Sequence, residues 1–214
     1  MSTKLQTRVE LKGVDIEFFK KIVLEEVYLE DRHKDTLAYI SKLKLDISTL
    51  NFSKHSLVFD LLRLENVKFY LKKYKGEKDL NIQFLADAFS GTDTSKGAAW
   101  TLKRSRVELK NASFIYRDED YATTSFGINY DDLDVRQLNA TFENVSLRND
   151  TLLCRTRHLG LVEKSGFILS DFRANIILTP KELTCLNLVV KTPTTDVRTD
   201  LSFLFDSFSD WTDF

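Results

Sequence analysis

A short unit of alternating apolar and polar residues recurs along the chain. In each copy two apolar residues alternate, a two-residue break follows, and the alternation resumes on the opposite phase. Alternation with a period of two is typical of a β-strand with one apolar face. The clearest copy begins at Leu62, and a second begins 45 residues later at Val107. Six copies can be recognised, with breaks at Glu25–Glu26, Glu65–Asn66, Lys110–Asn111, Glu143–Asn144, Ser170–Asp171 and Leu186–Asn187.

These breaks predict bends within strands. Side chains alternate between the two faces of a strand, so each break would turn the later apolar residues to the wrong face unless the backbone absorbs a residue. A β-bulge does this, and Asn and Asp adopt a positive φ more readily than most residues. We therefore expect bent strands that keep one apolar face. The other interpretation is that two strands are joined by a turn at each Asn.

Two stretches depart from the strand pattern. Asp79–Phe89 predicts a short amphipathic helix, which would line a groove or plug the end of a sheet. Gly13–Lys20 is a second candidate for a short helix. The polar stretch 90–99 then predicts a flexible connector between a first β segment, 1–89, and a second, 100–214. Seven Gly and two Pro are few for a chain with many tight turns and favour long strands in a simple meander.

The composition excludes several classes of function. With 31 basic and 32 acidic residues the formal net charge is −1, so the chain has no excess of positive charge for a nucleic-acid partner. Cys154 and Cys185 share no metal-binding spacing. Two buried free thiols are expected, and the alternative is a disulfide, which requires an oxidising compartment. The three His residues also lack such a spacing. No phosphate-binding loop or nucleophile motif is present, so we expect no enzyme activity, cofactor or metal.

One acidic segment leaves alternatives open. Asp118–Asp134 contains two clusters of carboxylates that could supply oxygen ligands for Ca²⁺ or belong to an enzyme site with perturbed pKa values. The segment lacks the spacing and the glycine of an EF-hand loop, so a solvated loop is the simpler interpretation. No stretch of the chain approaches the roughly 18 apolar residues of a membrane-spanning helix, and Met1–Lys21 has no signal-peptide layout.

Nine short motifs spread over nearly the whole chain form a recognisable pattern. They are Val14–Ile22, Val27–Asp31, Asp35–Leu37, Leu43–Ile47, Leu64–Tyr70, Asn81–Phe84, Phe114–Asp120, Asn129–Val135 and Lys164–Phe167. Taken together, these motifs resemble the amino-terminal periplasmic part of TamB proteins, in the AsmA-like superfamily, especially the Bacteroidota type. TamB is the inner-membrane component of the translocation and assembly module.

The resemblance implies a mostly β fold, an elongated antiparallel meander curled into an open, taco-like groove with one or two short helices. It implies a segment of a periplasmic bridge protein that transports phospholipid between the inner and outer membranes. An inner-membrane helix and a long carboxy-terminal part that meets an Omp85-type outer-membrane partner are expected in the family and absent from this chain. Acyl chains would contact the groove candidates Leu62, Leu64, Val67, Phe69, Val107, Leu109, Ala112, Phe114, Phe142, Val145 and Leu147.

The sequence is also compatible with two other hypotheses about the role of the chain and of its apolar residues. In the first, the chain is a scaffold for outer-membrane protein assembly or secretion that captures unfolded strands at an open sheet edge. In the second, the groove candidates are ordinary core residues, covered by a second sheet or by the helix at Asp79–Phe89. An open sheet with an exposed apolar face also predicts self-association of the isolated segment.

Overall fold

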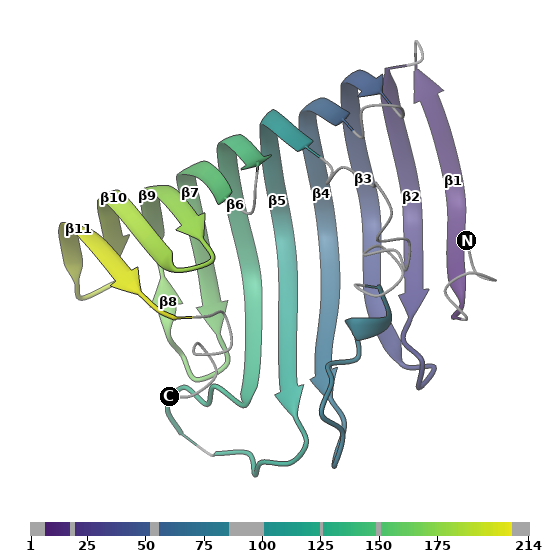
Figure 1. Ribbon diagram of the computed structural model, residues 1–214. Helices are drawn as coiled ribbons and strands as arrows, with labels where there is room; N and C mark the ends of the chain where they lie inside the picture. The colour runs from purple at the N-terminus through teal and green to yellow at the C-terminus, as the bar shows by residue number, and fades with distance from the viewer. Residues whose placement is uncertain are drawn as a thin grey trace.

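The computed structural model of the chain is built almost entirely of β-strands (Figure 1). It describes residues 7–17, 20–51, 56–85, 101–124, 126–148 and 151–206. The strands in these ranges are β1 (Val9–Glu17), β2 (Lys21–Glu30), β3 (Thr36–Asn51), β4 (Ser56–Lys73), β5 (Thr101–Asp118), β6 (Asp132–Arg148), β7 (Thr151–Glu163), β8 (Ile168–Leu169), β9 (Asp171–Thr179), β10 (Glu182–Lys191) and β11 (Asp196–Leu204).

The strands form one open sheet that follows the order of the sequence, which confirms the predicted mostly β architecture. Their order is β1-β2-β3-β4-β5-β6-β7-β9-β10-β11, and the short β8 pairs with β7. Neighbours are antiparallel except β4 and β5, which are parallel, so the sheet departs from a pure meander at this pair. The long connection between β4 and β5 allows the chain to return and pair in this way. The expected connector, 90–99, lies outside the described residues.

The strands bend where the sequence predicted. Positive φ values occur at Glu26 (51°), Asn66 (50°), Asn111 (51°), Asn144 (55°) and Asn187 (53°). Each of these residues lies inside a continuous strand. The interpretation as bends is therefore confirmed at five of the six breaks, and the alternative of a turn between two strands is wrong there.

The sixth break and one further bend differ from the prediction. At Ser170–Asp171 the strand stops, because β8 ends at Leu169 and β9 begins at Asp171. The Ser170 amide donates to the carbonyl of Lys191 (2.8 Å) and so leaves the pairing with β7. A further positive φ occurs at Gln137 (51°), where no bend was expected.

One of the two predicted short helices occurs in the structure. A helical turn at Gln83–Leu85 lies within the predicted stretch Asp79–Phe89, but Leu80 forms an antiparallel bridge with Lys73 instead, and residues 86–89 lie outside the described residues. Gly13–Glu17 belong to β1, so the prediction of a helix at Gly13–Lys20 is wrong. The alternating apolar residues of this stretch pair with β2 as an edge strand. In the described part of the chain, the structure has no helix long and apolar enough to cross a membrane.

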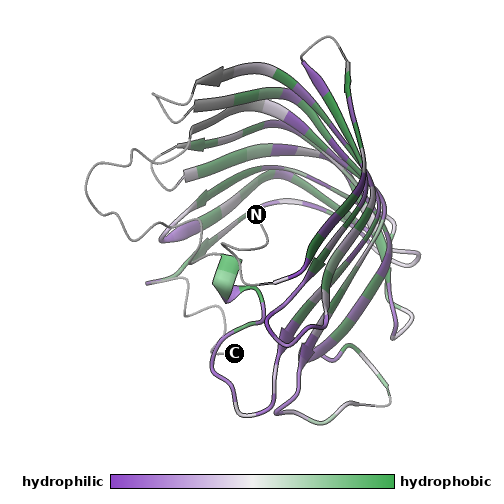
Figure 2. Cartoon of the chain, turned by 90° about the vertical axis from the view of Figure 1, so that its right-hand side faces the viewer, coloured by the Kyte–Doolittle hydropathy of each residue, from purple (hydrophilic) through white to green (hydrophobic). Residues whose placement is uncertain are grey.

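The strands bend midway, so the sheet has a concave and a convex face (Figure 2). Small side chains near the bends identify the concave face. They are almost fully buried, although no second sheet covers them among the described residues. Ala112, Ala140 and Ala174 are 3–4% exposed, which requires larger neighbours on the same face to converge over them. These Ala residues share a face with the apolar alternation, and the Asn residues at the bends are exposed. The apolar face is therefore the concave one.

Candidate functional site: the concave apolar face

Apolar side chains form rows that cross the sheet from strand to strand. Residues directly opposite each other on neighbouring strands point to the same face, so the register defines each row. One row crosses eight strands and consists of Ile16, Ile22, Leu45, Leu62, Val107, Phe142, Thr156 and Ala174. We call the side of the sheet that contains this row the apolar face.

The register places the predicted groove candidates on this face. Leu62 is opposite Val107, Leu64 is opposite Leu109, and Phe69 is opposite Phe114. β6 pairs with the other edge of β5. The bends keep the candidates that follow them on the same face as the candidates that precede them. The remaining candidates join the same face through the pairs Val67–Ile40, Ala112–Leu138, Phe142–Val107 and Val145–Ser105, and Leu147 follows Val145 by alternation.

The candidates on this face are partly accessible. Phe69 and Phe114 stack across the parallel pair of strands with ring centroids 6.0 Å apart. Both rings are only partly buried, Leu147 is exposed, and Ala112 alone among the candidates is buried. The second sheet proposed as a cover does not occur in the described residues, and the described helical turn is only three residues long. The apolar face therefore resembles an open trough more than a closed core.

The helical turn lies at one end of the concave side (Figure 2). Its Phe84 is 3% exposed, and the guanidinium of Arg32 lies 5.5 Å from the centre of the ring. The turn is fixed through Asn81, whose side-chain oxygen accepts from the Lys72 amide (2.9 Å). The helical turn therefore covers one end of the apolar face and leaves most of that face uncovered.

A buried carboxylate organises the same end of the sheet. Asp31 is 1% exposed and accepts hydrogen bonds from the amides of His33 (2.9 Å) and Asp35 (3.0 Å). Its second oxygen accepts from the Tyr74 hydroxyl (2.7 Å) and the Asn81 amide group (2.9 Å). Burial and the neighbouring carboxylates raise the pKa of Tyr74, so its hydroxyl remains a donor. Asp31 thus ties the β2–β3 turn to the segment that follows β4.

The convex face is stabilised by ion pairs between strands. Arg63 on β4 contacts Glu108 on β5 (2.7 Å), and Arg106 on β5 contacts both Glu108 (2.7 Å) and Glu143 on β6 (3.6 Å). Arg157 on β7 extends this series to Glu143 (3.2 Å). The sheet therefore has one charged face and one apolar face, the alternation that antiparallel sheets commonly show.

The pKa of Glu108 reflects this network. Burial raises it, but the hydrogen bonds and charges of Arg63 and Arg106 together outweigh burial, so the net shift is downward. The carboxylate is therefore ionised throughout the neutral range and remains paired.

The acidic segment forms ion pairs with basic residues of neighbouring elements. Lys73 donates to Asp118 (3.0 Å) and Asp120 (3.1 Å), and Lys164 contacts Asp132 (2.6 Å). The pKa of Asp120 is lowered by a hydrogen bond from the Gly76 amide and by Lys73. Among the described residues no group of three or more His, Cys, Asp or Glu side chains is arranged to hold a metal ion.

Cys154 and Cys185 are free thiols, as expected, but only Cys185 is buried and Cys154 is partly exposed. Both lie opposite Ile176, one on each side of β9. Two strand spacings separate them by about 9.6 Å, beyond the roughly 7 Å that a disulfide can span. Burial raises the pKa of both thiols, so they contribute to the apolar face as small protonated side chains.

Sequence reasoning missed much of the face at the two ends of the sheet. Ile22, Leu43 and Leu45 extend it across β2 and β3, and Ile176 and Leu183 extend it across β9 and β10. The same alternation marks these residues, but only the register of neighbouring strands reveals that they continue one surface.

The fold and the site define the chain as an open, single-sheet β protein with a concave apolar face and a charged convex face. Comparison with known proteins identifies no relative, because no family model matches the chain and no curated protein matches it. The apolar face itself is therefore the feature that indicates a function.

Proposed function

We propose that the concave apolar face binds the acyl chains of phospholipids and forms a segment of a lipid conduit. The observation that carries this proposal is the row of apolar and small side chains that crosses eight strands, from Ile16 to Ala174. No catalytic step is needed for this role.

The dimensions of the row fit an acyl chain. At the usual strand spacing of about 4.8 Å, the row extends about 34 Å. One leaflet of the hydrocarbon core of a bilayer is about 15 Å thick, so the row is long enough for an extended acyl chain. Each methylene buried on the face contributes about 0.8 kcal/mol. Binding of this kind needs no fixed polar contact, which allows a lipid to move along the face.

The apolar face is open at both edges of the described sheet. Ile16 on β1 is 59% exposed, and Phe203 on β11 is 51% exposed. Both residues continue the apolar alternation, since Ile16 is opposite Ile22 and Phe203 is opposite Leu183. A lipid that moves across the strands therefore meets apolar side chains from one edge to the other. This favours a conduit over a closed binding pocket.

The proposal agrees with the resemblance to TamB proteins. On this interpretation the chain is part of a periplasmic bridge between the inner and outer membranes that is tethered to the inner membrane. An Omp85-type outer-membrane protein would be the partner of this bridge. The partners of the segment itself are phospholipid acyl chains.

Native mass spectrometry of the protein purified from an envelope-targeted expression strain tests this function. We expect phospholipid to co-purify with the wild-type protein. Phe69→Asp combined with Phe114→Asp places two charges in the centre of the apolar face, and we expect the bound lipid to be lost.

The matched control is Lys68→Asp combined with Ser113→Asp. These residues precede Phe69 and Phe114, pair with each other and lie on the opposite face. The control should keep its lipid, and circular dichroism should show that all variants are folded. A folded wild-type protein without lipid, or equal loss in both double variants, would contradict the proposal.

A second candidate function is capture of unfolded outer-membrane strands by the edge of the sheet. The observation that favours it is β11, which pairs only with β10 among the described strands and is exposed along its whole length. Such capture relies on backbone hydrogen bonds, so Pro substitutions along the outer side of β11 would abolish it. The same substitutions should leave lipid binding unchanged if the conduit function is correct.

A further inference from the structure

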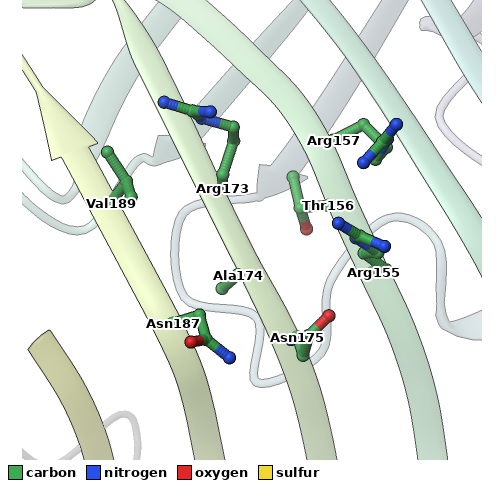
Figure 3. Close-up of a pocket in the computed structure, with 8 residues that line it drawn as sticks. All are labelled: Arg155, Thr156, Arg157, Arg173, Ala174, Asn175, Asn187 and Val189. Atoms are coloured by element: carbon green, nitrogen blue, oxygen red, sulfur yellow. The ribbon is translucent and has the colours of Figure 1, made fainter. Parts of the chain in front are cut away.

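A hollow of about 430 Å³ is lined mainly by residues on the face of the sheet opposite the apolar face, and Thr156 and Ala174 of the apolar row also border it. It is formed by β7, β9 and β10, and the side chains around it are shown in Figure 3. The residues that matter here are Arg155, Arg157, Arg173, Asn175, Asn187 and Val189, which we call the arginine hollow.

The register brings the three arginines together. Arg155 and Arg157 flank Thr156 on β7 and therefore point away from the apolar row that contains Thr156. Arg173 comes from β9, the next strand, and Asn175 on β9 is directly opposite Arg155. Figure 3 shows the three arginines around the same hollow, with the residues of β10 on its other side.

The hollow contains more positive than negative charge. None of the side chains that line it is acidic. Arg157 contacts Glu143 through Nε (3.2 Å), and Arg173 contacts Asp171 through Nε (2.8 Å). Arg155 is directly opposite Glu143 on β6, but Glu143 contacts Arg106 and Arg157 instead, and Arg155 forms no ion pair with the described residues. Its guanidinium therefore retains donors for a ligand.

We infer that the arginine hollow binds a phosphate monoester. Such a group carries a charge of about −1.5 to −2 near neutral pH and has three acceptor oxygens. Guanidinium groups recognise it by paired hydrogen bonds, and three of them around one hollow match its charge better than that of a single carboxylate. The amide groups of Asn175 and Asn187 add neutral donors. Because this site lies on the charged face, it does not depend on lipid binding by the apolar face.

The same phosphate group can come from a soluble metabolite or from a lipid headgroup at a membrane surface. Glycerol 3-phosphate, titrated into the full chain and followed by NMR, probes the soluble source. Vesicles of phosphatidylcholine with and without phosphatidic acid probe the headgroup source by co-sedimentation. Each probe is applied to the wild type, to Arg155→Gln, to Arg155→Lys and to Arg136→Gln.

Arg155→Gln should weaken binding about tenfold, because it removes charge-assisted hydrogen bonds. Arg155→Lys keeps the charge but loses the planar pair of donors, so its affinity should lie between wild type and Arg155→Gln. Arg136→Gln on β6 removes the same charge outside the hollow and should bind like wild type. Binding of glycerol 3-phosphate identifies a soluble ligand, and binding only to vesicles with phosphatidic acid identifies a headgroup. Failure to bind either probe, or equal binding by wild type and Arg155→Gln, would overturn the inference.

Discussion

Replacing Asn111 by Val and by Gly tests whether the bends are built into the backbone. Asn111 has a φ of 51° within β5. A left-handed conformation costs an ordinary L-residue about 1–2 kcal/mol, and the cost is greater for a β-branched residue. Gly adopts it without this cost. The two variants therefore differ mainly in how well they tolerate the bend.

The side chain of Asn111 also contributes a hydrogen bond. Its Nδ2 donates to Oδ1 of Asn66 on β4 (2.8 Å), where the neighbouring strand bends in register. Both variants lose this bond, which is exposed and contributes about 0.5–1 kcal/mol. We expect Asn111→Val to lower the free energy of unfolding by about 2–3 kcal/mol and Asn111→Gly by about 1 kcal/mol.

The neighbouring Lys110 provides the matched control. It is exposed on the same strand, and its φ is not among the positive values. Lys110 belongs to the same break but pairs with Glu65 of β4, and at a strand position without a positive φ Val is favoured over Gly by about 1 kcal/mol. Lys110→Val should therefore be more stable than Lys110→Gly, the reverse of the order at Asn111.

Urea unfolding followed by circular dichroism measures all four variants. A shift of the midpoint at constant slope reports a change in stability. If Asn111→Val were as stable as Asn111→Gly or more stable, the bend would not be a property of the backbone at this residue, and the account of the concave face would be refuted.

Three further results are expected. Asp31→Asn replaces a buried carboxylate, which accepts hydrogen bonds, by an amide whose NH₂ group faces donors, and it should lower the free energy of unfolding by about 2–4 kcal/mol. An unchanged urea midpoint would show that the hydrogen bonds to Asp31 do not stabilise the fold. The pKa of Glu108 is lower in the folded protein than the ordinary value of about 4.5 that it has in the unfolded chain. The ionised carboxylate therefore stabilises the fold fully above pH 4.5, and this stabilisation is lost as the pH falls through the pKa of the folded protein. Glu108→Gln should therefore flatten the loss of stability below pH 4.5, and an unaltered acid-unfolding profile would contradict this. The open edges at β1 and β11 should make the segment self-associate with rising concentration, and a constant monomer mass in sedimentation velocity would refute this.

The bends were predictable because they leave two signals in the sequence. The apolar phase changes at each break, and Asn is among the few residues that accept a positive φ. Gln137 shows the limit of the second signal. The alternation Leu133, Val135, Leu138 and Ala140 changes phase around it in the same way, so the phase change alone would have identified the bend.

The pairing of strands was harder to predict. The copies that begin at Leu62 and Val107 match because β4 and β5 lie side by side in parallel with a constant offset of 45 residues. Equal spacing of two strands along a sequence does not reveal their direction, which depends on the long connection between them. At Ser170 the phase change marks the end of a strand, because its amide bonds to β10 instead of β7. The extent of the apolar face also depends on pairing, so the sequence identified its centre but missed its ends.

Photocrosslinking from two neighbouring residues of β4 tests the central claim most directly. Phe69 lies on the apolar face and Lys68 on the opposite face, so p-benzoylphenylalanine at each position samples one side of the sheet. If the apolar face carries lipid, irradiation in the cell envelope should join the probe at position 69 to phospholipid acyl chains and give no such product at position 68. Equal products from both positions, or none from position 69 in a folded protein, would contradict the proposed function.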